Sequence, residues 1–155
     1  VARVLNETGL DAALLELEIT ESMVMHDPEH AIEVLSKLKA MGISISIDDC
    51  GTGYSSLSYL KRFPINSVKI DRSFIKDLPL DSDDAAITQA IIAMAHGLKL
   101  KVIAEGAETG EQLNFLRAHD CDEMQGYYFS KPLPEHEFVL LVQNSIAAGA
   151  VRSQG

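Results

Sequence analysis

The stretch Ile43-Ser44-Ile45-Ser46-Ile47-Asp48 alternates apolar and polar residues along its whole length. Successive side chains of a β-strand point to opposite faces of its sheet, so the stretch predicts a strand with an isoleucine face and a polar face. The neighbouring predicted strands, Leu14 to Ile19, Ser67 to Ile70 and Leu100 to Ala104, repeat this alternation. Their polar residues are Glu16, Glu18, Ser67, Lys69 and Lys101, and Glu105 directly follows the last strand on the same face. One polar face therefore continues from strand to strand.

Amphipathic segments with helix-capping residues separate these strands. Asp27 precedes a proline at the first helical position, Ser82 is expected to cap the longest internal helix, and Thr109 with Gln112 forms a capping-box pattern. The predicted helices run from Pro28 to Gly42, from Ser82 to Gly97, from Thr109 to about His119 and from Pro134 to about Ala148, and a further short helix ends at about Leu60. Ile87, Ile91 and Ala95 form the expected buried stripe of the helix after Ser82. A fifth strand is predicted near Met124.

Strands that alternate with helices predict an α/β fold with a parallel sheet, either doubly wound or closed into a barrel. The strands of a doubly wound sheet are covered on both faces and should be apolar almost throughout. A polar face that points inward favours a TIM-type (β/α)₈ barrel, with its active site at the carboxyl ends of the strands. A one-layer antiparallel sheet with a solvated face is the alternative, and the intervening helices argue against it.

Composition predicts a single compact domain over residues 1–155. The net charge of −10 and only 13 lysines and arginines exclude the basic surface that binds long nucleic acid. We find neither an apolar run of membrane-spanning length nor a signal-peptide pattern, and we expect no membrane contact by this segment. Cys50 and Cys121 lack the spacing of a disulfide framework or a zinc site, which favours reduced thiols in the cytoplasm.

Charged residues stand at or near the carboxyl ends of four successive predicted strands, at Glu18, Asp48, Lys69 and Glu105, and Asp49 adds another carboxylate. Carboxylates brought together repel one another unless a cation intervenes, and Mg²⁺ or Mn²⁺ prefers oxygen ligands. Taken singly, each residue has another explanation: solvent exposure for Glu18, loop capping for the Asp pair, a salt bridge for Lys69 and proximity to a helix N-terminus for Glu105. Together they predict a metal-dependent site.

Separated motifs of the chain resemble, in the same order, those of EAL-domain cyclic-di-GMP phosphodiesterases. The motifs are Leu17-Glu18-Ile19-Thr20-Glu21-Ser22, Asp48-Asp49-Cys50-Gly51-Thr52-Gly53-Tyr54-Ser55-Ser56-Leu57, Val68-Lys69-Ile70-Asp71, Ala104-Glu105-Gly106-Ala107-Glu108 and Gln125-Gly126-Tyr127-Tyr128-Phe129-Ser130-Lys131-Pro132. The resemblance covers essentially the whole chain. It implies hydrolysis of one phosphodiester bond of cyclic di-GMP, giving linear pGpG, with two Mg²⁺ or Mn²⁺ ions and inhibition by Ca²⁺.

The resemblance also implies residue roles. It makes Glu18, Asp48 and Asp49 metal ligands, with Asp48 bridging. Lys69 would hold the nucleophilic water and Glu105 would act as, or support, its general base. The implied supporting residues are Glu21 beside the Gly-rich loop, the loop residues Gly51, Thr52, Gly53, Tyr54, Ser55 and Ser56, and the site-lining or second-layer residues Glu108, Gln125 and Asp71.

Two departures from the family pattern matter. Cys50 replaces the usual Phe, which predicts looser packing of the Gly-rich loop. Val1 falls in the helix before the family's fourth strand, so we expect an N-terminally truncated domain with strands 4 to 8, about five of the eight units of a complete barrel. The Glu-Ala-Leu motif and an Asn ligand would then be absent, and the fragment would be inactive or weak. Its open sheet edge predicts a homodimer or higher self-association.

Other functions remain open at this point. The domain could be a non-catalytic cyclic-di-GMP receptor or a protein-interaction module that has kept the fold. A different metal-dependent phosphatase on an α/β sheet is the third possibility, and the strand alternation disfavours it. We expect the parent protein to have further signalling domains and to be cytoplasmic, or to place this domain on the cytoplasmic side of a membrane-anchored parent.

Overall fold

The computed structural model describes residues 1–51 and 57–152, with side chains described as far as residue 145. Thr52, Gly53, Tyr54, Ser55 and Ser56 of the predicted loop lie outside the described residues. The elements in chain order are α1 (Ala2–Thr8), η1 (Ala12–Leu14), β1 (Glu16–Thr20), α2 (Glu21–His26), α3 (Pro28–Ala40), β2 (Ser44–Cys50), α4 (Leu57–Leu60), β3 (Ser67–Ile70), η2 (Arg72–Phe74), α5 (Ser82–Gly97), β4 (Lys101–Glu105), α6 (Gly110–Ala118), β5 (Glu123–Gln125) and α7 (Glu135–Arg152).

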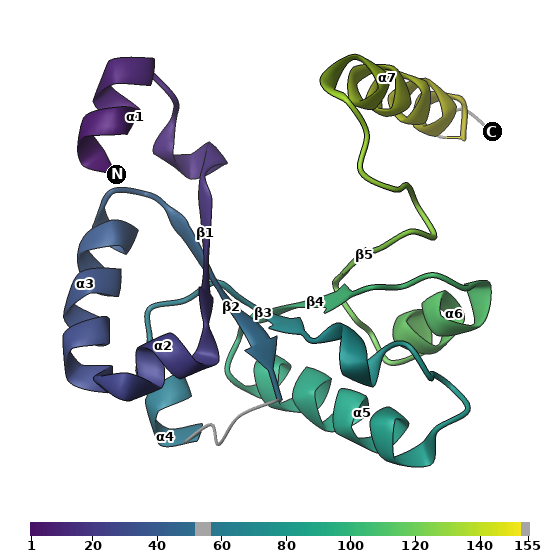
Figure 1. The fold of residues 1–155 in the computed structure, drawn as a ribbon, viewed down its shortest axis with the longest axis horizontal. Helices are drawn as coiled ribbons and strands as arrows, with labels where there is room; N and C mark the ends of the chain where they lie inside the picture. Colours follow the sequence, from purple (N-terminus) through teal and green to yellow (C-terminus); the bar gives the residue numbers. More distant parts are fainter. Residues whose placement is uncertain (52–56, 153–155) are drawn as a thin grey trace.

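The strands form one parallel sheet in the order β1-β2-β3-β4-β5, which is also their order in the chain. A doubly wound sheet reverses its strand order at a switch point, and the described strands show no such reversal. Right-handed crossovers that all advance in one direction place their helices on one face. Figure 1 shows α2 to α6 arrayed around that side of the strands. The α/β prediction is confirmed, and the arrangement is that of part of a barrel.

The two faces of the sheet differ as the alternation predicted. Ile45, Ile47, Val68, Ile70, Val102 and Ala104 are fully buried and form the core with α3, α5 and α6. The opposite face carries rows of polar partners, such as Glu18, Ser46 and Ser67 on β1, β2 and β3. This polar face is what positions the candidate site.

Local capping chemistry explains most of the helix boundaries, with one correction. The Asp27 carboxylate accepts a hydrogen bond from the amide of His30, and the predicted capping box of Thr109 and Gln112 is present. The prediction that Ser82 caps α5 was wrong. Asp81 is the cap, because its backbone is extended and its carboxylate accepts from the amides of Asp83 and Asp84, which makes Ser82 the first helical residue.

The buried stripe of α5 is also partly different from the prediction. Ile91 and Ala95 are buried, but Ile87 is exposed, and Thr88 takes its place on the face that packs toward the sheet. The Thr88 hydroxyl donates a hydrogen bond to the backbone oxygen of Phe74 in η2, which holds this end of α5 at the segment after β3.

The helices at the two ends of the chain contribute little to the core. Leu5 is the only buried residue of α1, whereas Val4 is exposed. On α7 the apolar run from Phe138 to Val142 is exposed, and Figure 1 shows this helix apart from the others, joined to β5 by an extended segment. Among the described residues, no helix combines the length and the apolarity needed to cross a membrane.

Both cysteines lie in the core, and desolvation by burial raises the pKa of Cys50 and of Cys121 to about 11. We predict that neither thiol of the folded protein reacts appreciably with iodoacetamide at pH 8, where about one in a thousand would be ionised. Because the folded state holds the proton more tightly than the unfolded state, the stability contributed by the neutral thiols should be lost as the pH rises from about 9 to about 11. Mass spectrometry of alkylated protein at pH 8, with urea-unfolded protein as the control, measures the reactivity. Equal labelling in both samples would contradict the prediction.

Candidate functional site

The centre of the polar face is Lys69 on β3, the middle strand of the sheet. Its ammonium lies 2.7 Å from Glu18 Oε1, contacts Glu105 Oε1 and is 4.0 Å from Asp48 Oδ1. The Lys69 side chain is only 4% exposed, whereas the Glu18 side chain is 50% exposed. One buried cation therefore joins carboxylates from β1, β2 and β4 at the carboxyl ends of the strands.

Small residues make this convergence possible, because β2 lies between Glu18 and Lys69. Ser46 on β2 is paired in register with Glu18 on one side and Ser67 on the other. Both serines are buried, and among the described residues neither hydroxyl has a hydrogen-bond partner. Their short side chains leave room for the Glu18 carboxylate and the Lys69 ammonium to meet across the intervening strand.

The electrostatics of Lys69 follow from two opposing causes. Burial disfavours the charged ammonium, but hydrogen bonds to Glu105 and Glu18, with the nearby charge of Asp48, outweigh burial and raise the pKa of Lys69. The lysine is therefore charged throughout the neutral range. It acts as a donor toward anionic groups and is unsuited to be a general base.

Asp48 and Asp49 end β2 in an irregular conformation. The β2–β3 register shifts between Ile47 and Cys50, and Asp49 has a positive φ of 56° with its amide donating to Asp48 Oδ1 over 2.9 Å. Such an irregularity redirects consecutive side chains at a strand end. Burial, together with the charges of Asp48 and Asp71, raises the pKa of Asp49. Negative charge at this corner is thus only partly compensated by Lys69.

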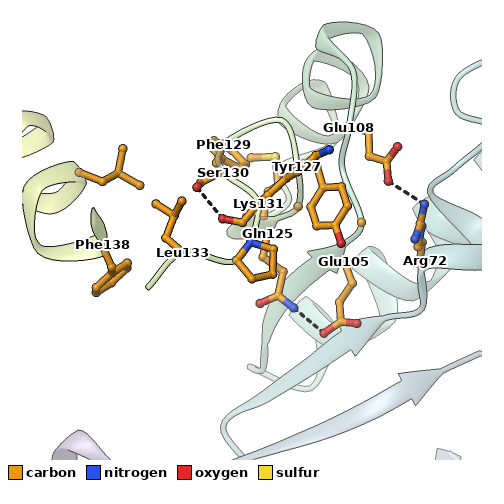
Figure 2. A pocket seen from close by; sticks show the side chains of 15 residues that line it. Arg72, Glu105, Glu108, Gln125, Tyr127, Phe129, Ser130, Lys131, Leu133 and Phe138 are labelled. Atoms are coloured by element: carbon orange, nitrogen blue, oxygen red, sulfur yellow. Dashed lines mark hydrogen bonds and ion pairs between the residues drawn. The ribbon is translucent and has the colours of Figure 1, made fainter. Parts of the chain in front are cut away.

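A second group of residues continues the site toward β5. Gln125 Nε2 donates to Glu105 Oε1 over 2.7 Å, and the Arg72 guanidinium lies 2.6 Å from Glu108 Oε1. Both pairs line a cleft of about 600 Å³, which also includes Tyr127 and Phe138 of α7. Figure 2 shows the two pairs with Tyr127 beside them and Phe138 farther away. A volume of this order suits a small ligand. The cleft brings the predicted residues Glu105, Glu108 and Gln125 together with Arg72 and Tyr127.

Arg72 and Tyr127 are lining residues to which the sequence analysis gave no role. Arg72 directly follows the Val68-Lys69-Ile70-Asp71 motif, and Tyr127 lies inside the motif that begins at Gln125. Their positions in the chain were the available signal. Only the fold shows that Arg72, after β3, reaches the loop after β4.

Two predicted supporting residues are placed differently from the cleft residues. The Asp71 carboxylate caps η2 by accepting from the amide of Ser73, and hydrogen bonding with Ser73 lowers the pKa of Asp71 despite its partial burial. Glu21 begins α2 and is 4% exposed, and its charge contributes to the raised pKa of Cys50. Glu21 therefore lies near the end of β2, while its predicted contact with the loop falls on residues outside the described part.

The donor chemistry of the predicted ligands fits a hard divalent cation, since Glu18, Asp48 and Asp49 supply only oxygen atoms. Burial and the charges of Asp48 and Asp71 raise the pKa of Asp49, and a bound cation would relieve the part of this that is repulsion. Within residues 1–51 and 57–145, however, no three His, Cys, Asp or Glu side chains are arranged to hold a metal ion. Glu18 and Asp48 are instead turned toward Lys69. The ligand set stays a prediction.

Comparison with known proteins decides the family. The sequence model of the EAL domain family matches residues 1–132 of this chain. The chain belongs to the EAL domain family. Cyclic di-GMP phosphodiesterase NbdA of Pseudomonas aeruginosa is 54% identical over 134 residues, which are 86% of this chain and 17% of that protein. The bifunctional diguanylate cyclase/cyclic di-GMP phosphodiesterase MucR of the same organism is 48% identical over 86% of this chain and 20% of its own length. The EAL chain spans about a fifth of the length of these relatives.

Solved structures agree on the fold. The cyclic-di-GMP complex of the PaMucR phosphodiesterase superposes with a TM-score of 0.86 at 48% identity, over 89% of this EAL chain and 56% of that chain. The manganese and cyclic-di-GMP complex of Klebsiella pneumoniae BlrP1 at pH 9.0 gives a TM-score of 0.77 at 32% identity, over 84% of this chain and 33% of that chain. A calcium and cyclic-di-GMP complex of BlrP1 matches equally well. These EAL structures have barrel folds of the TIM type.

The buried position of Lys69 makes it the cation on which the polar face depends. We predict that Lys69→Met lowers the free energy of unfolding by about 2–4 kcal/mol in buffer without divalent metal, because Glu18 and Glu105 lose their shared donor. Urea unfolding monitored by circular dichroism measures the loss.

Lys101→Met is the matched control for this prediction. Lys101 lies on the same face of the sheet and pairs with Glu123 at 2.9 Å, but both side chains are more than half exposed. An exposed pair contributes about 0–1 kcal/mol. Equal losses in the two variants would show that the contacts of Lys69 with its carboxylates contribute no more than an ordinary surface ion pair.

Proposed function

We propose that this chain forms strands 4 to 8 of a (β/α)₈ EAL barrel and that the complete domain hydrolyses one phosphodiester bond of cyclic di-GMP to give pGpG. The observation that carries the proposal is the convergence of Glu18, Asp48 and Glu105 on Lys69 at the strand ends. Support comes from relatives whose names specify cyclic-di-GMP phosphodiesterases and from neighbours whose titles specify cyclic-di-GMP complexes. The coverage of 56% of the PaMucR chain supports a partial barrel.

The described residues suit a hydrolytic step in distinct ways. The charged Lys69 can hold a water molecule by hydrogen bonding, and the adjacent Glu105 can take its proton as, or in support of, the general base. Gln125 fixes one oxygen of Glu105 by its hydrogen bond, so the other oxygen keeps a constant direction. Glu108 and Arg72 line the cleft in which the ligand would lie. The second-layer role of Asp71 is to hold the turn that begins with Arg72.

Two Mg²⁺ or Mn²⁺ ions at Glu18, Asp48 and Asp49, when bound, would supply an acidified water and neutralise the oxygens of the displacement. The manganese complex of the neighbour BlrP1 supports metal dependence, and the calcium complex with cyclic di-GMP is compatible with Ca²⁺ as an inhibitory ion. Glu21 and the loop from Gly51 to Ser56 are proposed to support this site from the end of β2.

A non-catalytic receptor is the second candidate. It is favoured by the absence, among the described residues, of a carboxylate cluster arranged for metal and by the engagement of Glu18 with Lys69. A receptor needs the cleft and its polar edge but no proton acceptor. The two candidates therefore differ in what they require of Glu105.

The cellular setting is proposed on the same basis. Cyclic di-GMP is a bacterial second messenger, so we propose a cytoplasmic domain within a longer signalling protein, as the bifunctional relative MucR suggests. Its ligand is a small cyclic dinucleotide, and the net charge of −10 argues against long nucleic acid.

Hydrolysis is tested with cyclic di-GMP and Mn²⁺, following pGpG by chromatography, for this chain and for a version extended N-terminally to a complete barrel. We expect turnover in the extended protein and little or none in the 155-residue chain. Glu105→Gln should lower kcat by about 10²–10⁴-fold because it removes the proton acceptor. The exposed Glu111→Gln is the control and should leave kcat unchanged.

The outcomes separate the two candidates. Micromolar binding of cyclic di-GMP by the extended protein without turnover would favour the receptor. If the extended protein neither binds nor hydrolyses cyclic di-GMP, both candidates are refuted.

Self-association of the 155-residue chain is proposed from its sheet edges. Among the described strands, β1 pairs only with β2 and β5 only with β4, so each presents an unpaired edge, and the apolar run of α7 is exposed. We expect light scattering to give a dimer or larger species whose mass rises with protein concentration. The N-terminally extended protein, in which the edges would be closed, should associate less. A concentration-independent monomer of the short chain would contradict the proposal.

A further inference from the structure

Gln112 is a buried polar residue of α6 that bonds to two segments of the chain at once. It is 3% exposed, and its Oε1 accepts hydrogen bonds from the amides of Glu108 at 2.7 Å and Thr109 at 2.9 Å. Its Nε2 donates to the backbone oxygen of Lys76 at 2.8 Å. The orientation of the amide is determined by these partners, because the reverse assignment would place donors against donors and an oxygen against a carbonyl.

The two joined segments carry different parts of the site. Lys76 follows η2 in the segment after β3, the strand that holds Lys69, and this segment also carries Arg72. Glu108 and Thr109 belong to the loop after β4, the strand that ends at Glu105. A bond between these segments therefore sets the spacing between the groups that follow β3 and those that follow β4.

The other links between these segments constrain that spacing less. The pair of Arg72 and Glu108 has side chains that are 60% and 40% exposed, and such pairs are weak because solvent screens them. The aliphatic part of the Arg72 side chain also packs against Gly106, where a Cβ atom would collide with Arg72. The segment after β3 and the loop after β4 are therefore already in contact. The buried bond of Gln112 is the link that water does not compete for.

Helix capping alone does not account for this side chain. In the capping box the Thr109 hydroxyl accepts from the amide of Gln112, and the Gln112 side chain returns a bond to the amide of Thr109. That pattern uses only Oε1 of the amide. The bond from Nε2 to Lys76 is additional, and it is the one that leaves the helix.

We propose that Gln112 is a positioning residue for the reaction, which holds the segment after β3 against the loop after β4 and so keeps Arg72 and Glu108 in place around Glu105. The inference rests on the proposed hydrolysis of cyclic di-GMP. Gln112 lies behind the loop and acts through Glu108 and Lys76, without contact with the ligand cleft.

The test compares Gln112→Glu with Thr109→Ala in the full-length protein that carries this chain. Gln112→Glu keeps the size of the side chain and the acceptor for the two amides, but it replaces the donor facing Lys76 by an oxygen. Thr109→Ala weakens the same helix start and leaves that donor in place. We expect Gln112→Glu to lower kcat for cyclic di-GMP by between about tenfold and a hundredfold, with a smaller change in KM, because misplacement of reacting groups has effects of this size.

The control decides between positioning and stability. Thr109→Ala should lose much less kcat than Gln112→Glu when both are assayed at a temperature at which circular dichroism shows each variant to be fully folded. Equal loss of kcat in the two folded variants would overturn the proposal, and so would a kcat for Gln112→Glu within twofold of the wild type.

Amide hydrogen exchange provides a readout that needs no activity. Exchange should rise in the peptides covering residues 71–78 in Gln112→Glu but not in Thr109→Ala. If the wild-type protein does not hydrolyse cyclic di-GMP, the proposed function fails, and unchanged exchange in residues 71–78 would then also overturn the positioning role. A rise confined to that segment would show, without any activity measurement, that Gln112 holds the two segments together.

Discussion

The ammonium of Lys69 is the constraint around which the polar face is organised. A lysine buried in the middle of a sheet must be paired, because an isolated charge there would lose its proton or unfold its surroundings. Its partners come from β1, β2 and β4, so the register of four strands has to be correct at once. The serines at Ser46 and Ser67 are small because larger side chains would fill the space in which these charges meet. The apolar face of the same strands requires only that its side chains fill the available volume.

Backbone contacts also hold the loops that follow the carboxyl ends of the strands. The amide of Ala107 donates to the backbone oxygen of Gln125, and the oxygen of Ala107 accepts from the amide of Tyr128. Gly126 lets the backbone of Ala107 approach so closely that any Cβ atom would collide with it. The loop after β4 is therefore enclosed between the segments after β3 and β5, with Gln112 behind it. Glu105 and Glu108 owe their positions to backbone contacts as much as to their own side chains.

The sequence predicted what local chemistry decides. Alternation placed Ile45 and Ile47 opposite Ser46 and Asp48 because side-chain direction in a strand follows from the backbone alone, and Asp27 and the Thr109 capping box act within one helical turn. The Asp81 cap is local as well, but Asp81 and Ser82 are both good capping residues and the sequence does not show which of the two is extended. The exposure of Ile87 depends on how α5 packs against the sheet, which no local pattern contains. In the site, the strand-end charges were foreseen. Their common contact with Lys69, the reach of Arg72 to Glu108 and the second bond of Gln112 join residues tens of positions apart and required the fold.

The identity of spatial and chain order in the sheet has a consequence for how the molecule is assembled. Each strand pairs with the strand synthesised immediately before it, so no later segment has to be inserted between two that are already paired. A nascent chain can extend its sheet one β-α unit at a time as it leaves the ribosome, and each new edge is covered by the next unit to emerge. Pairing between strands that are neighbours in the chain closes shorter loops than the pairing that closes a complete barrel, so this part of the sheet can form before the barrel closes.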